Sequence, residues 1–282
     1  MADLTTLEAI RRDLKSPQIT LGTSDDDLLR RLIHEASAYI EQRTGRWFVA
    51  LRAVQKYDAL GDTIGLRHLD TPDLLEVVTL TNGDGIAYGP SDFVLEPYNR
   101  WPKTRIQLKL TASGFAYSDD PYGAIQVDGW WGFHSAYASA WIATLDTVQD
   151  NPLTAGATSI TVADADGLDA HGDLRFPVLG YCKIENEVVQ VTAANPSTNV
   201  LTVWRGVQGT TAVQHIKTTA ISRYIPDADI ERACLGLVNY LYRTKDIGVS
   251  ERIQTLDGTV QTNTVPQYVL ETIARHIPLG VG

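Results

Sequence analysis

The chain has 282 residues, of which 44% are hydrophobic and 21% are charged. This composition is typical of a globular protein and excludes a disordered or fibrous one. The 24 basic and 34 acidic residues give a net charge of −10, which argues against a protein whose main task is to grip DNA or an anionic membrane.

The N-terminal part of the chain predicts two helices. A short helix is expected over residues 7–14, before the break at Ser16-Pro17. A longer helix follows residues 23–27, where a hydroxyl can cap free amides and three acids face the positive end of the helix dipole, and it ends at Gly45. Its apolar side chains recur every three or four positions, which predicts one buried face. They are Leu28, Leu29, Leu32, Ile33, Ala36, Tyr39 and Ile40.

A β-rich pattern follows as far as about Phe133, with short runs of branched and aromatic residues between turn residues. The predicted strands are 49–57, 74–80, 93–95, 106–110 and 125–131. Residues 82–85, Asn-Gly-Asp-Gly, predict a hairpin turn, because asparagine and glycine accept the positive φ of tight turns.

A second β-rich block over residues 135–224 has its own turn residues, and its predicted strands are 159–162, 181–184, 187–192 and 200–204. The helical spacing returns after Pro226-Asp227 and ends near Lys245, and a last short helix follows Pro266. Between them, residues 250–264 are polar and predict an arm or a loose strand pair.

This order predicts an α+β fold in which the helices near the two ends pack on each other. The expected domains are a helical core of residues 1–48 and 225–282 with a C-terminal arm, a small β-domain of residues 49–134, and an inserted β-rich domain of residues 135–224.

The usual signatures of catalysis and cofactor binding do not occur in the sequence. It has no phosphate-binding loop, no dinucleotide fingerprint, no nucleophile elbow and no zinc helix, and its six histidines do not cluster at metal-ligand spacing. We therefore expect no enzyme, no catalytic residue, no cofactor and no metal. Cys182 and Cys234 form no CxxC pair, which indicates reduced thiols in a protein made inside the cell.

The chain start and its hydropathy also predict an aqueous location. Asp3 stands where a Sec-type export signal needs basic residues. No uncharged apolar run approaches the about 18 residues that a membrane helix requires. We therefore expect no contact with a membrane.

Two segments leave alternatives open. The acids of residues 164–173 can collect around a calcium ion, although the glycine is misplaced for an EF-hand and a solvated turn is the expected structure. Trp130 and Trp131 can stack on sugars or bases, can anchor an interface, or can pack on opposite faces of a strand.

Residues 23–47, an acidic cap and an amphipathic helix that ends Ile40-Glu-Gln-Arg-Thr-Gly-Arg46, resemble the opening of tailed-bacteriophage head–tail connector (adaptor) proteins. Residues 125–133 and 225–242 are similar to later segments of that family. Residues 250–253 and 265–270 fit its C-terminal arm and terminal helix.

The block at 135–224 departs from that family, whose members have only a few residues there. It resembles a small β-module of phage tail and fibre proteins, most specifically in the run Arg205-Gly-x-x-Gly-Thr-Thr-Ala-x-x-His215. Two unrelated segments thus indicate the same kind of particle.

The resemblance implies a structural virion protein that forms a homo-oligomeric, dodecameric ring at the viral neck. The ring docks under the portal protein, meets a stopper or tail-completion protein, and gives a channel for DNA ejection. DNA is then only passing cargo, and virion assembly takes place in the host cytoplasm. An acidic ring agrees with this role, because a basic lumen would hold the phosphates.

In this interpretation the C-terminal arm and helix contact the portal or a neighbouring subunit, and the insertion projects outward or toward the tail. The interface candidates are Arg252, Ile253, Tyr268, Leu270 and Ile273, with Trp130 and Trp131 as the aromatic candidates. One alternative is a tail-completion or baseplate protein built on the same β-module. The other is a carbohydrate-binding or hydrolytic protein, which the tryptophan pair would serve.

Overall fold

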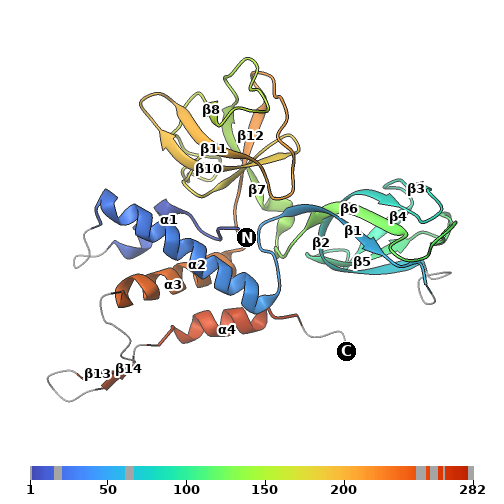
Figure 1. The fold of residues 1–282 in the computed structure, drawn as a ribbon, viewed down its shortest axis with the longest axis horizontal. Coiled ribbons are helices and arrows are strands. Elements are labelled where there is room, and N and C mark those ends of the chain that lie inside the picture. The colour runs from blue at the N-terminus through green and yellow to red at the C-terminus, as the bar shows by residue number, and fades with distance from the viewer. Residues whose placement is uncertain are drawn as a thin grey trace.

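A computed structural model describes residues 2–15, 21–60, 67–245, 252–254, 260–262 and 264–278. In these residues the chain forms helices at both ends of a long β-rich middle (Figure 1), so the α+β class is confirmed. The α-helices are α1 (Leu7–Leu14), α2 (Asp26–Thr44), α3 (Ala228–Thr244) and α4 (Gln267–Arg275).

The first sheet is antiparallel and has the strand order β1-β6-β2-β5-β4, with β3 paired to β2. Its strands are β1 (Leu51–Tyr57), β2 (His68–Thr81), β3 (Ala87–Tyr88), β4 (Phe93–Glu96), β5 (Lys103–Leu108) and β6 (Ile125–Trp131). The hairpin predicted at residues 82–85 is confirmed, since it joins β2 to β3 and the Gly85 N–H donates to the Asn82 carbonyl at 3.0 Å. β1 forms one edge of this sheet.

The second sheet is also antiparallel, with the order β7-β12-β9-β10-β11-β8. Its strands are β7 (Trp141–Thr147), β8 (Ser159–Thr161), β9 (Tyr181–Ile184), β10 (Glu187–Asn195), β11 (Val200–Val207) and β12 (Ala220–Tyr224). The sequence did not predict β7 and β12. Their alanine, aspartate and serine residues have weak strand propensity, and each strand is defined by pairing with the other about 80 residues away.

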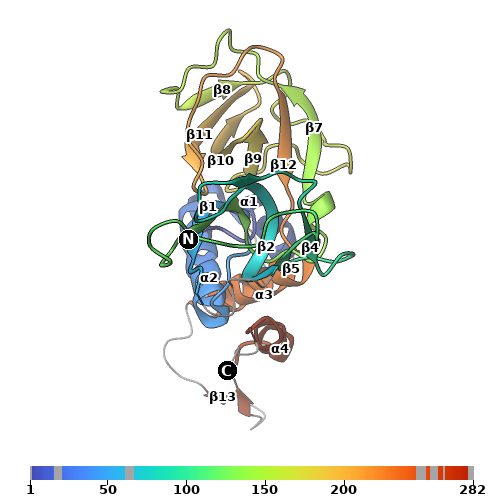
Figure 2. The ribbon, with the colours of Figure 1, turned by 90° about the vertical axis from the view of Figure 1, so that its right-hand side faces the viewer.

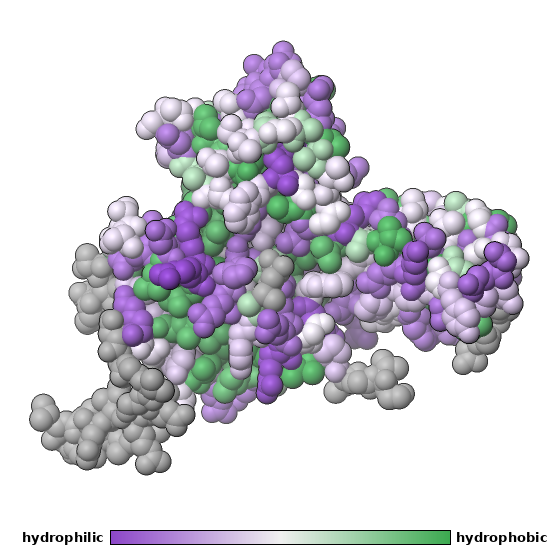
Figure 3. Space-filling view, viewed as in Figure 1, coloured by the Kyte–Doolittle hydropathy of each residue, from purple (hydrophilic) through white to green (hydrophobic). Residues whose placement is uncertain are grey.

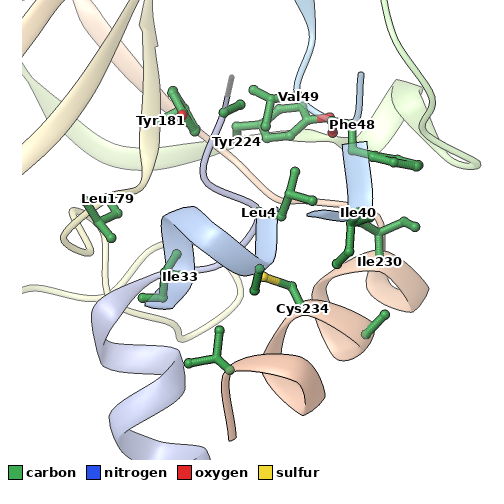
Figure 4. Packing of buried hydrophobic residues seen from close by; sticks show 14 of the residues in the cluster. Leu4, Ile33, Ile40, Phe48, Val49, Leu179, Tyr181, Tyr224, Ile230 and Cys234 are labelled. Atoms are coloured by element: carbon green, nitrogen blue, oxygen red, sulfur yellow. The ribbon is translucent and has the colours of Figure 1, made fainter. Parts of the chain in front are cut away.

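The four helices pack together around one hydrophobic cluster. Figure 4 shows Leu4 in this cluster together with Ile33 of α2 and Cys234 of α3. Gly45 ends α2 as predicted, with φ of 64° and its N–H on the Glu41 carbonyl at 2.8 Å. The predicted hydroxyl cap of α2 is wrong, because the N-cap residue is Asp25 and its side chain caps no amide of the helix; it accepts the Gly22 N–H at 2.9 Å.

The buried face of α2 is narrower than predicted. Leu29, Ile33, Ala36 and Ile40 are fully buried, whereas Tyr39 is exposed and Leu28 and Leu32 are half-buried. In the part of the chain that the structure describes, no helix is both long and apolar enough to cross a membrane.

Buried hydrophobic side chains form three clusters: one in the helical layer, one inside the first sheet and one inside the second sheet. The exact domain boundaries at residues 48, 134 and 224 stay a prediction. In Figures 1 and 2 the second sheet stands above the helices, and in Figure 1 the first sheet extends to one side of them.

The second sheet is hydrogen-bonded to the N-terminal segment and the helices. The Asp3 carboxylate accepts Gln190 Nε2 at 2.7 Å, and the Tyr181 hydroxyl accepts the Asp3 N–H at 2.9 Å. Arg30 of α2 donates to the Thr192 carbonyl at 3.0 Å. These contacts fix the second sheet on the helical layer, while its expected direction toward a tail stays a prediction.

Residues 250–264 include the strand pair that the polar composition predicted. β13 (Arg252–Gln254) and β14 (Val260–Thr262) form a separate two-stranded sheet. This hairpin lies between α3 and α4 in the chain and away from both large sheets in Figure 1.

Candidate assembly surface and buried polar networks

The predicted contact residues of α4 lie on two different faces of the helix. Tyr268 and Leu270 are 39% and 45% exposed, so both remain candidates for contact with another chain. Ile273 is only 3% exposed and belongs to the helical cluster together with Val269. The prediction that Ile273 contacts a partner is therefore wrong, because positions four apart on a helix share one face and this face is directed at α3.

Arg252 and Ile253 lie on β13, where the backbone of Ile253 pairs with Gln261 of β14. Their side chains fall outside the residues that the structure describes. Their role in an interface stays a prediction.

Helix α4 is held close to α3 at Gly236. A Cβ atom on Gly236 would overlap the Tyr268 hydroxyl and lie 2.9 Å from Val269 Cγ2. Arg232 lies over the Tyr268 ring, 5.1 Å from its centroid. Because Gly236 has no side chain, α4 can lie close to α3, and this close approach fixes the position of the exposed face of α4.

Replacing Gly236 with alanine is expected to destabilise the chain by about 1–2 kcal/mol, because the overlap outweighs the better helix propensity of alanine. The loss is expected to be smaller in a Tyr268→Phe background, where the overlapping oxygen is gone. Urea unfolding of the single and double variants measures both values. An equal loss in the two backgrounds would show that the hydroxyl contact is unimportant.

Trp130 and Trp131 are 2% and 0% exposed. Trp130 belongs to the helical cluster, whereas Trp131 belongs to the cluster of the first sheet and donates from Nε1 to the Ala53 carbonyl at 2.9 Å. Packing on opposite faces of one strand, one of the three interpretations, is confirmed. Their proposed roles as interface anchors or sugar-stacking rings are wrong, because neither ring is accessible.

Trp130 connects the two large sheets. Lys183 Nζ of β9 lies 5.2 Å from the Trp130 ring centroid and 5.3 Å from that of Trp141. The Arg52 guanidinium also lies near this ring, 5.8 Å from the Trp130 centroid. Burial lowers the pKa of Lys183, and a cation between aromatic faces stabilises the contact between the sheets.

The acidic segment 164–173 is an ion-paired turn. Both Arg223 Nε and Nη2 donate to Asp169 Oδ2, at 3.0 and 2.6 Å. Burial raises the pKa of Asp169, but hydrogen bonds from the N–H of His171, from Arg223 and from the N–H of Asp173 outweigh it and leave the pKa below its ordinary value. Arg175 lies within 3.5 Å of Asp164 Oδ2. Among the described residues, no group of three potential ligands is arranged to hold a metal.

The run from Arg205 to His215 folds around the buried carboxylate of Glu187. Glu187 Oε2 accepts Arg205 Nη2 at 2.8 Å, the Val213 N–H at 3.1 Å and His215 Nε2 at 2.9 Å. The other ring nitrogen of His215, Nδ1, lies 2.8 Å from Glu185 Oε2. Burial raises the pKa of Glu187, yet these donors outweigh it and hold the pKa below its ordinary value.

Glu41 is a buried carboxyl in the helical layer, with 8% of the residue exposed. Burial raises its pKa to about 7 and outweighs the hydrogen bonds from the backbone of Ala2 and Phe48. Burial also raises the pKa values of Glu8, Asp73 and Glu231. Cys182 and Cys234 are buried and free, as predicted.

Sequence reasoning missed Glu187 and Lys183 as contact residues. The only available signal was the Arg205–His215 run with its two glycines, because nothing local connects Glu187 to residues 18 to 28 positions later. The chain matches no known protein-family model, and no curated protein has a matching sequence.

Proposed function

We propose that the chain is the subunit of a head–tail connector ring in a tailed bacteriophage, docked under the portal at the viral neck. Support comes from the resemblance of residues 23–47 and 225–270 to adaptor proteins and of residues 135–224 to a tail and fibre module. In this role the subunit joins the DNA-filled head to the tail and leaves a channel for the DNA.

The observation that carries the proposal is the helical layer built from both ends of the chain. Helices α1 and α2 share one hydrophobic cluster with α3 and α4, and hydrophobic side chains gather along this layer in Figure 3. On α4, Tyr268 and Leu270 are exposed. Large exposed side chains on a helix that is itself anchored are suited to bind another protein.

The hairpin β13–β14 supports assembly into a ring. An isolated two-stranded sheet is marginally stable in water, so contact with another chain would stabilise it. A hairpin on one side of the molecule contacts a different surface of the next copy, and such head-to-tail contacts form a closed ring when the rotation permits.

Light scattering of the purified chain, alone and with a candidate portal, tests the proposal. We expect a ring, or a monomer that joins the portal assembly. Leu270→Asp is expected to weaken that association about tenfold or more, since it places a charge in an apolar contact. Leu110→Asp is the matched control, because Leu110 is 87% exposed and follows β5 of the first sheet.

A monomer that ignores the portal would contradict the proposal. Binding to an isolated tail or baseplate assembly in that case would favour the tail-completion alternative. The burial of Trp130 and Trp131 removes the observation on which the carbohydrate-binding alternative depended.

A further inference from the structure

The loop between β11 and His215 touches the first sheet as well as its own. Within the first sheet β1 is an edge strand paired only with β6, opposite Trp130 at Arg52. On the free side of β1, the Arg52 N–H donates to the Gln208 carbonyl at 2.9 Å. We propose that the loop 205–215 is a joint that fixes the first sheet relative to the second.

Gln208 and Gly209 are the loop residues that contact β1, and their backbone conformations permit this close approach. Gln208 has a φ of 53°, which costs a non-glycine residue about 1 kcal/mol or more. Gly209 has a φ of 71°, and a Cβ atom there would overlap the Arg52 carbonyl oxygen. A strained residue such as Gln208, or a glycine that leaves room such as Gly209, is expected at a contact that natural selection maintains.

A network of charged and polar side chains holds the loop in its conformation. Glu185 and Glu187 contact the two ring nitrogens of His215, and Arg205 pairs with Glu187. Each ring nitrogen of His215 thus lies within hydrogen-bond distance of a carboxylate oxygen, at 2.8 Å from Glu185 and 2.9 Å from Glu187. Thr210 completes the network, since its hydroxyl accepts the Val188 N–H at 3.0 Å and donates to the Val207 carbonyl at 2.7 Å.

Packing alone does not hold the sheets together at this place. A cleft of about 430 Å³ separates them beyond the loop, with Val54 and Val78 of the first sheet and Val213 of the loop exposed along it. The Trp130–Lys183 contact and the loop tip are two separate contacts between the sheets. Two points of contact prevent the rotation that a single point would allow.

The role as a joint explains the two glycines of residues 205–215 and does not require a ring of subunits. Gly206 turns the chain back with a φ of 62°, where a Cβ atom would lie 2.8 Å from the Ala212 nitrogen. Gly209 lets β1 approach, and Arg205 and His215 attach the ends of the loop to Glu187. The inference does not depend on the proposed function.

Gly209→Ala in the full chain tests the joint. The exchange of the Arg52 amide is expected to be about tenfold faster or more, since its acceptor moves away. The amides of Val191 and Val203, bonded within the second sheet to the carbonyls of Gly180 and Thr158, are expected to stay within about twofold of the parent. The control is Gly156→Ala, which has open space at its Cβ position.

Spin labels on Leu110→Cys and Ser197→Cys report the relative position of the two sheets. Both sites are exposed, and the native cysteines are buried. A narrow distance distribution in the parent that broadens in Gly209→Ala supports the joint. Unchanged Arg52 exchange with an unchanged distribution would overturn it, and so would equal acceleration at Val191 and Val203, which would mean that Gly209 only stabilises the second sheet.

Discussion

Replacing Glu187 with alanine is expected to destabilise the second sheet by about 3–5 kcal/mol, the cost of removing one partner of a buried ion pair. The side chain is completely buried, and it contacts Arg205, His215 and the N–H of Val213. Without it the Arg205 guanidinium and the His215 ring each lose a buried acceptor, while Arg205 keeps the Val213 carbonyl and His215 keeps Glu185. The loop and strand β11 are expected to lose order first.

Urea unfolding and the exchange of the Val191 amide measure this loss. Glu185→Ala is the matched control, because Glu185 touches the same His215 ring while its side chain is 60% exposed. For an exposed pair we expect a loss of at most about 1 kcal/mol. Equal losses for the two variants would show that burial of Glu187 does not set the strength of the network.

The stability of the chain is expected to fall with rising pH through Glu41. The folded chain holds this proton up to about pH 7, whereas the ordinary pKa is 4.5. Below pH 4.5 the full contribution is present, and it is lost progressively as the pH rises to 7, because the folded state then has to bury a charge. The shift corresponds to about 3 kcal/mol in total.

Urea unfolding at pH 5.5 and pH 8 tests this expectation. The free energy of unfolding of Glu41→Gln is expected to fall by about 2 kcal/mol less than that of the parent over this interval, since the amide cannot ionise. Glu8, Asp73 and Glu231 shift in the same direction but are present in both proteins and cancel in the comparison. Glu35→Gln, at an exposed position on the same helix, controls for the lost charge. An identical pH dependence in parent and Glu41→Gln would contradict the prediction.

The helices were predictable from the sequence because their signals are local. The spacing of apolar residues and the terminal residues Gly45 and Pro266 placed all four α-helices of the described chain close to their observed bounds. The same spacing places Ile273 on the buried face of α4, four residues after the buried Val269. The resemblance led to its choice as an interface residue, and the helical period contradicts that choice.

The contacts between the sheets were not predictable, because they depend on pairing between distant segments. The period of two in β6 required Trp130 and Trp131 to face opposite sides, but nothing local shows that the second sheet covers Trp130. Likewise Glu187 meets Arg205 only after β10 pairs with β11. A resemblance of short motifs gives a proposed role, and the geometry of those contacts gives the variants that test it.

The pairing of β7 with β12 has a consequence for how such a chain can change in length. Trp141 lies opposite Tyr224, and the Ile225 N–H donates to the Ala140 carbonyl at 2.8 Å. The two points at which the backbone enters the second sheet and leaves it are therefore neighbours in one ladder. A short turn could connect Ala140 directly to Ile225. The second sheet can therefore be gained or lost at these positions, as the extension of a hairpin, without moving α3. The geometry explains how a protein of this kind can acquire a β-module while its remaining architecture stays in place.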